Sequence, residues 1–289
     1  MAKQKVGRTA LGAAVCRMIE QYEPDKTRLF NDPLVKELVS APIRWVMQFA
    51  PMRNLTVKQT DAVAAGIFGV QICRTRYIDD TFQAALAQGL PQVVILGAGL
   101  DTRPYRLLGK KVVVHVFELD LPAAQKDKKK KLAKYLGKLP ENVTYIPIDF
   151  DTQSLESVFA GTSFDRTRPA VFLWEGVTQY LSERAVQRTL DFVGKSAPGS
   201  LLIFTYVLKS IINRRSDIPD ANNMLDTVAK SAPWIFGLEP SGLPDFLKPF
   251  HLALVADVGA PSYQERYLRP LGRSLAVFAG ERIALARVI

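Results

Sequence analysis

Hydrophobic residues are spaced in two different ways along this chain, and the spacing changes near residue 89. Residues 1–88 carry apolar positions at helical intervals, as in TALGAAVCRMIEQYE, and contain no strand-like run. Gly89 and Pro91 then end this section, because both residue types interrupt helices. The pattern predicts a helical N-terminal segment over residues 1–88 that covers the rest of the fold.

After Gly89, short apolar runs alternate with polar segments of helical character. Five of these runs predict strands, at residues 92–96, 112–119, 143–148, 170–174 and 201–207. Several are apolar at consecutive positions, which is typical of strands covered on both faces. Strands that alternate with helices pair in parallel through right-handed crossovers. The predicted fold class is therefore α/β, with a doubly wound, mostly parallel sheet.

The alternation breaks down in the last third of the chain. Residues 208–250 combine repeated prolines with helical pieces, so we expect an insertion or lid after the fifth strand. Its aromatic residues, Trp234, Phe236, Phe246 and Phe250, either line an acceptor pocket or pack the lid, and the sequence favours neither role. The final stretch, SLAVFAGERIALARVI, has two apolar runs around Ala279-Gly280-Glu281. These runs predict an antiparallel C-terminal hairpin at the sheet edge. The whole then forms a seven-stranded sheet in a single domain over residues 1–289.

Composition excludes several classes of protein. The chain has 289 residues, and 48% of them are hydrophobic, enough to bury a sizeable core, so intrinsic disorder is excluded for most of the chain. Its two cysteines, Cys16 and Cys73, exclude a disulfide-rich scaffold and a four-cysteine zinc site. Because His115 and His251 are the only histidines, we expect no metal site.

The N-terminus and the hydropathy pattern predict a cytoplasmic protein. Uninterrupted apolar runs of about 18 residues, the length needed to span a bilayer, do not occur. The basic N-terminus leads into an apolar stretch that Arg17 and Glu20 interrupt, and no convincing cleavage site follows, which argues against a signal peptide. We therefore expect no membrane partner, and reduced thiols.

The net charge of +10, from 38 basic and 28 acidic residues, leaves several partners open. Nucleic acid, an anionic membrane surface and acidic small molecules are candidates, as is a soluble enzyme with a basic surface, which we favour. The run KDKKKKLAK adds much of the charge, but its lysines cannot all share one side of a helix. We expect it to form a solvated outer face. Only Tyr135 lies nearby to stack on bases, so a nucleic-acid partner is disfavoured.

The sequence VVILGAGLDTRPYRL carries the strongest functional signal. A buried strand leads into Gly97-Ala98-Gly99, and glycines there allow a ligand to approach the backbone at the carboxyl end of a strand. A dinucleotide-binding fold usually has a third glycine or an alanine at the position that Thr102 occupies here. The carboxylate of Asp101 is also a poor neighbour for pyrophosphate and a tolerable one for a cation. The loop thus favours S-adenosylmethionine, and a tight turn without a ligand is the alternative.

Acidic residues follow the next strands at the same edge of the sheet. Asp120 lies 21 residues beyond Gly99, where a carboxylate that accepts the ribose hydroxyls is expected, with Glu118 as the same-face alternative. Asp149 and Phe150 follow the third strand and suit an adenine, although an N-cap of the next helix is the other interpretation of Asp149 or Asp151. Glu175 follows the fourth strand. The repetition predicts one ligand site.

At these residues the chain resembles the leucine carboxyl methyltransferase family, a branch of the class I S-adenosylmethionine-dependent methyltransferases that includes bacterial polyketide O-methyltransferases. The matching motifs are TALGAAVCRMIE, RTRYIDD, VVILGAGLDTRPYRL, FELDLP, the segment around Asp149, FLWEGVTQYL and YLRPLGR. The resemblance covers nearly the whole chain. It implies the Rossmann-like class I methyltransferase fold and S-adenosylmethionine as cofactor.

The resemblance also implies roles for individual residues. Arg74 matches the family's arginine for the methionine carboxylate, with Arg76 as the close alternative. The other matches are Gly97 and Gly99 for the methionine part, Asp120 for the ribose, Asp149 and Phe150 for the adenine, and Glu175 after the fourth strand. The family has more small or apolar residues where this chain has Gly176-Val177-Thr178-Gln179-Tyr180, so its acceptor preference is not carried over.

These observations predict O-methylation of a carboxyl or hydroxyl group on a small molecule such as a secondary metabolite. An ionised carboxylate needs no general base, whereas a hydroxyl would be helped by one, for which Tyr180, Tyr206 and His251 are the candidates. Arginines that flank the predicted crevice, Arg74, Arg76, Arg103 and Arg106, favour an acidic acceptor.

Four alternative functions stay open from sequence. These are a protein C-terminal carboxyl methyltransferase, an RNA methyltransferase or nucleic-acid-binding protein, an NAD-type oxidoreductase, and a binding protein without activity.

Overall fold

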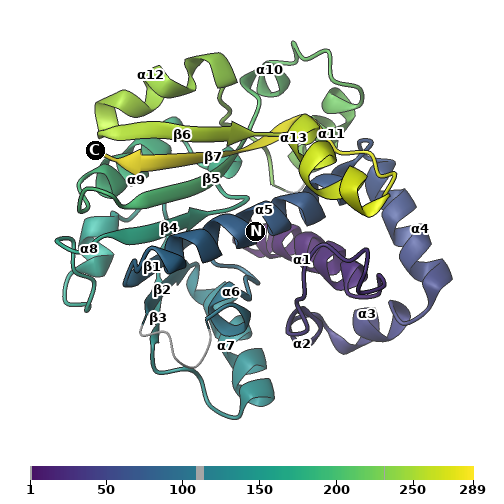
Figure 1. Cartoon of the computed structure of the whole chain (residues 1–289), viewed down its shortest axis with the longest axis horizontal. Coiled ribbons are helices and arrows are strands. Elements are labelled where there is room, and N and C mark those ends of the chain that lie inside the picture. Colours follow the sequence, from purple (N-terminus) through teal and green to yellow (C-terminus); the bar gives the residue numbers. More distant parts are fainter. Residues whose placement is uncertain (1, 109–113, 231) are drawn as a thin grey trace.

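The computed structural model describes residues 2–108, 114–230 and 232–289, with side chains from Thr9 onward. A seven-stranded sheet runs through its centre in the order β3-β2-β1-β4-β5-β7-β6 (Figure 1). The strands are β1 Gln92–Leu96, β2 His115–Asp120, β3 Val143–Pro147, β4 Ala170–Trp174, β5 Leu201–Val207, β6 Leu252–Val258 and β7 Glu281–Val288. Strands β1 to β5 pair in parallel, and β7 lies antiparallel between β5 and β6. The predicted α/β class and its mostly parallel seven-stranded sheet are confirmed.

The central strands are hydrophobic throughout because both of their faces are covered. Every residue of β1, β4 and β5 is buried. On one face, Val93 and Ile95 join a core that includes side chains of the N-terminal helices α1 (Ala2–Glu20) and α5 (Ile67–Ala87). On the other face, Val94 and Leu96 pack with side chains of the helices α8 (Leu155–Phe159), α9 (Glu183–Gly194) and α12 (Leu243–Leu247). Continuous apolar runs therefore mark buried strands here, as the sequence pattern predicts.

Helices precede and connect the strands. Those before β1 are α1 Ala2–Glu20, α2 Val35–Leu38, α3 Ala41–Val46, α4 Ala50–Asp61 and α5 Ile67–Ala87. The α-helices between β1 and β5 are α6 Arg103–Arg106, α7 Pro122–Leu136, α8 Leu155–Phe159 and α9 Glu183–Gly194, with the 3-10 turn η1 Thr178–Tyr180 after β4. Figure 1 shows α1 lying beyond the carboxyl ends of the parallel strands. The described part of residues 1–88 is thus helical where the periodicity predicts helices. None of the described helices combines the length and apolarity that crossing a bilayer requires.

Residues 208–250 form short helices between β5 and β6. They are α10 Lys209–Ile212, α11 Ala221–Ala229, η2 Pro240–Gly242, α12 Leu243–Leu247 and η3 Lys248–Phe250. After α11 the chain returns to the sheet, where Leu238 N donates to Val207 O (3.0 Å). Just before this contact, Ile235 N donates to Gln179 O (2.8 Å), which joins the segment to η1.

The C-terminal strand pair differs from the predicted hairpin. Residues 281–288 form β7 as expected, but residues 274–278 are not a strand, and the outer partner of β7 is β6 at Leu252–Val258. Between β6 and β7 lie α13 Ala260–Tyr263, η4 Gln264–Leu268 and η5 Arg269–Leu271. β6 is an edge strand whose central residues are partly exposed; its apolar run from Leu252 to Ala256 was not among the predicted strands. The run before Ala279 is apolar for another reason, since Phe278 enters the core while its N–H donates to Gly66 O (2.9 Å).

The lysine run on α7 is not uniformly solvated. Lys128 is 1% exposed, and its Nζ lies 2.8 Å from Oε2 of Glu118, although Lys129 and Lys130 are exposed as expected. Helical spacing explains the exception, because Lys128 falls on the inner face of α7 between the buried residues Gln125 and Leu132. The expectation of a solvated outer face is therefore wrong at Lys128.

Candidate functional site

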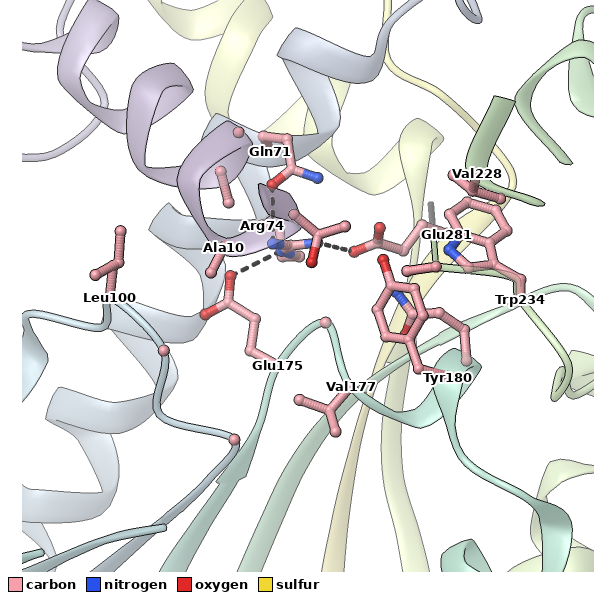
Figure 2. A pocket seen from close by; sticks show the side chains of 18 of the residues that line it. Ala10, Gln71, Arg74, Leu100, Glu175, Val177, Tyr180, Val228, Trp234 and Glu281 are labelled. Carbon is pink, nitrogen blue, oxygen red and sulfur yellow. Dashed lines mark hydrogen bonds and ion pairs between the residues drawn. The ribbon is translucent and has the colours of Figure 1, made fainter. Parts of the chain in front are cut away.

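A cavity of about 650 Å³ opens at the carboxyl ends of the parallel strands. Its walls come from the loop after β1, from the ends of β2, β3 and β4, from the helices α1 and α5, and from the segment around α11 (Figure 2). The volume falls within the range of about 300–1,000 Å³ that small-molecule sites occupy. The position matches the ligand crevice of open α/β sheets.

The loop after β1 needs glycine for two reasons. Gly97 and Gly99 adopt φ values of +73° and +40°, in the left-handed region that side chains disfavour. A Cβ atom at Gly97 would also lie 2.4 Å from Cγ2 of Val177. The N–H groups of Gly97 and Ala98 both donate to Leu119 O (2.8 Å each), which fixes the loop against the end of β2. The loop can therefore present its backbone to a ligand at short range.

Asp120 joins this loop to the second strand. Its Oδ2 accepts from Gly99 N (2.5 Å) and its Oδ1 from Leu121 N (2.6 Å), while the side chain lines the cavity. Burial raises the pKa of Asp120, although the two backbone N–H groups lower it in part. Gly99 and Asp120, predicted as neighbours from their spacing, are in contact.

Glu118, the alternative to Asp120, is fully buried and does not line the cavity. Its Oε1 accepts from the Tyr105 hydroxyl (2.8 Å), and its Oε2 pairs with Lys128. The two acids therefore differ in access, and only Asp120 can reach a ligand in this cavity.

Asp149 and Phe150 line the cavity at the end of β3, next to Asp151. The N-cap of α8 is Ser154, whose side chain accepts from Ser157 N. An N-cap role for Asp149 or Asp151, the other interpretation of this segment, is therefore excluded. Asp149 Oδ1 instead accepts from Asp151 N (3.3 Å) within the loop.

Glu175 links two buried arginines at the cavity wall. Arg74 Nε donates to its Oε1 (2.8 Å), and Arg103 Nη1 donates to its Oε2 (2.6 Å). Burial raises the pKa of Glu175, but Arg103 and Arg74 outweigh burial and lower the pKa to about 2. Glu175 is therefore ionised at neutral pH and acts as the centre of a fixed ion-pair network.

Each arginine of the cavity wall is already paired with a carboxylate. Arg74 also donates to Oε1 of Glu281, and through Nη2 to Gln71 Oε1 (2.9 Å). Arg103 binds Asp101 Oδ2 (2.6 Å) and Asp79 Oδ1 (2.8 Å) in addition to Glu175. Arg17, which the sequence patterns did not single out, donates to Asp32 Oδ2 (2.9 Å) and to Leu100 O (2.6 Å).

The other two arginines of the predicted crevice lie outside the cavity lining. Arg76 is partly exposed and pairs with Asp80 (2.8 Å), whereas Arg106 donates to Asp79 (2.7 Å). The arginines therefore give no support for an acidic acceptor, because each is paired with a carboxylate within the protein. Among the described lining residues, six carboxylates (Asp101, Asp120, Asp149, Asp151, Glu175 and Glu281) face three arginines.

Of the three candidate bases, only Tyr180 lines the cavity. Burial raises its pKa, although the neighbouring Trp234 and Thr9 side chains lower it in part. The Tyr206 hydroxyl donates to Asp257 Oδ1 (3.0 Å). His251 is exposed and directly precedes β6, at the edge of the sheet where β5 begins, whereas the cavity lies where the parallel strands end. Tyr206 and His251 are removed from the candidates by these positions.

The far wall of the cavity includes Trp234, one of the insertion aromatics, and Glu281, which the sequence patterns did not assign to a site. Glu281 enters from the start of β7, and Trp234 and Ile235 come from the segment after α11 (Figure 2). The remaining aromatics of residues 208–250, Phe236, Phe246 and Phe250, pack against the second core. The only sequence signal for Glu281 was a charge at the start of an apolar run.

The sequence profile of the leucine carboxyl methyltransferase family matches residues 10–194. A relative from Mycobacterium sp. (strain JLS) is 33% identical over 213 residues, which cover 71% of this chain and 68% of the relative. One from Mycolicibacterium gilvum is 36% identical over 209 residues, covering 70% and 66%. Both are described as candidate S-adenosyl-L-methionine-dependent methyltransferases, and the matches span about two thirds of their length.

Solved structures share the fold at low sequence identity. A methyltransferase candidate from Thermobifida fusca YX superposes with a TM-score of 0.60 at 16% identity, over 83% of this chain and 89% of that one. A protein of the DUF574 family from Streptomyces avermitilis gives a TM-score of 0.58 at 13% identity, over 83% and 92%.

Proposed function

The chain belongs to the leucine carboxyl methyltransferase family of S-adenosylmethionine-dependent methyltransferases, and from this membership we propose that it methylates an oxygen atom of a small molecule. The observation that carries the proposal is one continuous cavity. Leu100, which follows the glycine loop that Asp120 contacts, lies on one side of the cavity, and Tyr180 and Trp234 lie on the other, beside largely apolar residues (Figure 2). A cofactor and an acceptor can meet there.

The residues on the first side fit S-adenosylmethionine. Its sulfonium and ammonium outweigh its one carboxylate, so a wall in which acids outnumber arginines favours it electrostatically. Asp120 would accept the ribose hydroxyls, Asp149 and Phe150 would contact the adenine, and Gly97 leaves room for the methionine part. Arg74 uses three of its five N–H groups on Glu175, Glu281 and Gln71, which leaves two for the methionine carboxylate.

When bound, this cofactor supplies a methyl group already activated by a sulfonium leaving group. The chain's own residues then have to hold the acceptor oxygen in line with that methyl group at near-attack distance and exclude water. Val177 and Tyr180, which follow β4 directly, and Trp234, on the opposite wall, are suited to this positioning.

The same cavity argues against the main alternatives. A polyanion such as RNA, or the pyrophosphate of NAD, would meet a wall in which carboxylates outnumber arginines. Calorimetric titration tests the choice: S-adenosylmethionine and S-adenosylhomocysteine should bind, and NADH and short RNA should not. Release of S-adenosylhomocysteine with a panel of small hydroxyl and carboxyl compounds then tests the reaction.

Cofactor affinity should fall on acidification before an ordinary aspartate titrates. The raised pKa of Asp120 means that this carboxylate takes up its proton above the usual range of about 4, and a protonated Asp120 is a poorer acceptor for ribose hydroxyls. Glu175, with a pKa of about 2, stays ionised in that range. Calorimetry from about pH 7.5 to about pH 4.5 measures the decline. Asp120→Asn is the control, whose weaker affinity should stay flat; a matching decline in this variant would contradict the assignment.

A further inference from the structure

The acceptor end of the cavity has an acidic group in a mostly apolar surrounding. Glu281, the first residue of β7, extends its carboxylate toward Arg74, and the Tyr180 side chain lies beside it (Figure 2). Most lining residues around this group are apolar, although Gln71 and Gln179 also line the cavity. The apolar residues come from α5, η1, α11 and the segments beside them: Ile67, Val70, Val177, Leu181, Met224, Val228 and Phe278. An acceptor that fits here has an apolar body and one polar group.

Glu281 is held so that one oxygen stays available. Its side chain is 7% exposed, and Oε1 accepts from Nη1 of Arg74. Among the described hydrogen bonds, none ends on Oε2. Arg74 is fixed in turn by Glu175 and Gln71, so the Glu281 carboxylate has a rigid partner on one side and the chamber on the other.

The charge of this group discriminates between acceptors. A carboxylate acceptor would approach the Glu281 carboxylate, and like charges in a partly buried site repel strongly. The nearest arginine, Arg74, already pairs with both Glu281 and Glu175, so its single positive charge does not offset both carboxylates. A neutral hydroxyl, in contrast, can donate its proton to Glu281. The acidic acceptor that the sequence favoured does not suit this chamber.

Resting on the proposed methyl transfer, we propose that the acceptor is an apolar molecule with an un-ionised hydroxyl group and that Glu281 accepts the hydroxyl proton. The hydroxyl oxygen forms a bond to the methyl carbon, the carbon–sulfur bond breaks, and its electron pair stays on sulfur. The proton moves to Oε2 of Glu281 and then to solvent, so atoms and charge balance. Tyr180 keeps its own proton, because burial raises its pKa, and it positions the hydroxyl.

Matched pairs of compounds test this preference. We would titrate 2-naphthol against 2-naphthoate and 4-hexylphenol against 4-hexylbenzoate, at about pH 8 and in the presence of S-adenosylhomocysteine. At this pH the phenols are neutral and the acids are ionised. Each phenol should bind at least about ten-fold more tightly than its carboxylate. Carboxylates that bind as tightly as the phenols, or an absence of phenol binding, would overturn the inference.

Glu281→Gln tests the residue itself. The amide can still accept from Arg74 but carries no charge, so carboxylate affinity should rise about ten-fold, while methylation of the phenols should fall about 100-fold. Glu265→Gln is the matched control, because Glu265 is exposed and lies outside the cavity, and it should behave as the unmodified protein.

Measuring the affinity for S-adenosylmethionine shows whether the acceptor role of Glu281, the hydroxyl preference or the proposed function as a whole is wrong. Glu281→Gln should retain it; loss of cofactor binding in this variant would assign Glu281 to the cofactor and overturn the acceptor role. If the unmodified protein does not bind S-adenosylmethionine, the proposed function fails as a whole. If it binds the cofactor but prefers carboxylates, only the hydroxyl preference fails.

Discussion

Asp120→Ala should reduce S-adenosylmethionine affinity by about 100-fold to 10,000-fold, below the limit of most calorimetric titrations. A carboxylate that accepts both ribose hydroxyls makes two hydrogen bonds of about 1.5–3 kcal/mol each, and about 1.4 kcal/mol corresponds to a factor of ten. The substitution also removes the acceptor for Gly99 N, so the loop loses one of its three hydrogen bonds to the end of β2 and keeps the two to Leu119 O.

Asp127→Ala provides the control for this loss. Asp127 lies on α7, exposed to solvent and outside the cavity, and its side chain pairs with Lys131 at the surface. Its removal should leave cofactor affinity unchanged. Circular dichroism would check that Asp120→Ala is folded. Retention of affinity by a folded Asp120→Ala protein would contradict the ribose assignment.

The part of the site formed by successive parallel strands could be predicted from sequence. Gly97, Asp120, Asp149 and Glu175 each follow a strand of the β1-to-β4 series, and parallel strands bring their carboxyl ends to one edge. Local spacing was therefore sufficient to predict that these residues line one cavity. Their individual roles stay predictions.

The acceptor wall could not be predicted in this way. Glu281 lies 207 residues beyond Arg74, and they meet only because β7 inserts antiparallel between β5 and β6. The sequence pattern had placed the outer antiparallel strand at residues 274–278 rather than at β6. Trp234 reaches the cavity through backbone contacts of its neighbour Ile235 with Gln179, which no periodicity reveals.

Charge was the most misleading sequence signal. The arginines Arg74 and Arg103 suggested an anionic ligand, but each is neutralised by acids from distant elements such as Glu175. Composition gives the number of charged residues but does not show which of them form ion pairs with one another. The pairing depends on tertiary contacts, and it reverses the expected sign of the cavity wall from basic to acidic.

Arg103→Ala should destabilise the folded chain by about 3–5 kcal/mol, the usual effect of removing one partner from a buried ion pair. Arg103 is 2% exposed and contacts Asp79, Asp101 and Glu175, so its loss leaves three acids close together without their shared cation. Urea denaturation at neutral pH measures the change. Arg44→Ala is the control, because its pair with Glu37 is about one-third exposed and should contribute less than about 1 kcal/mol.

The pH dependence distinguishes lost ion pairs from lost packing. In the unmodified protein the pKa of Glu175 is lowered to about 2, so its stabilising contribution is present above the ordinary pKa of about 4.5 and disappears as pH falls toward 2. Arg103 causes most of this lowering and also lowers the pKa of Asp101 against the effect of burial. In Arg103→Ala these acids take up protons at higher pH, which relieves their repulsion. The stability deficit should therefore shrink on acidification from about pH 7 to about pH 4, whereas a deficit that is constant with pH would show that Arg103 acts through packing alone.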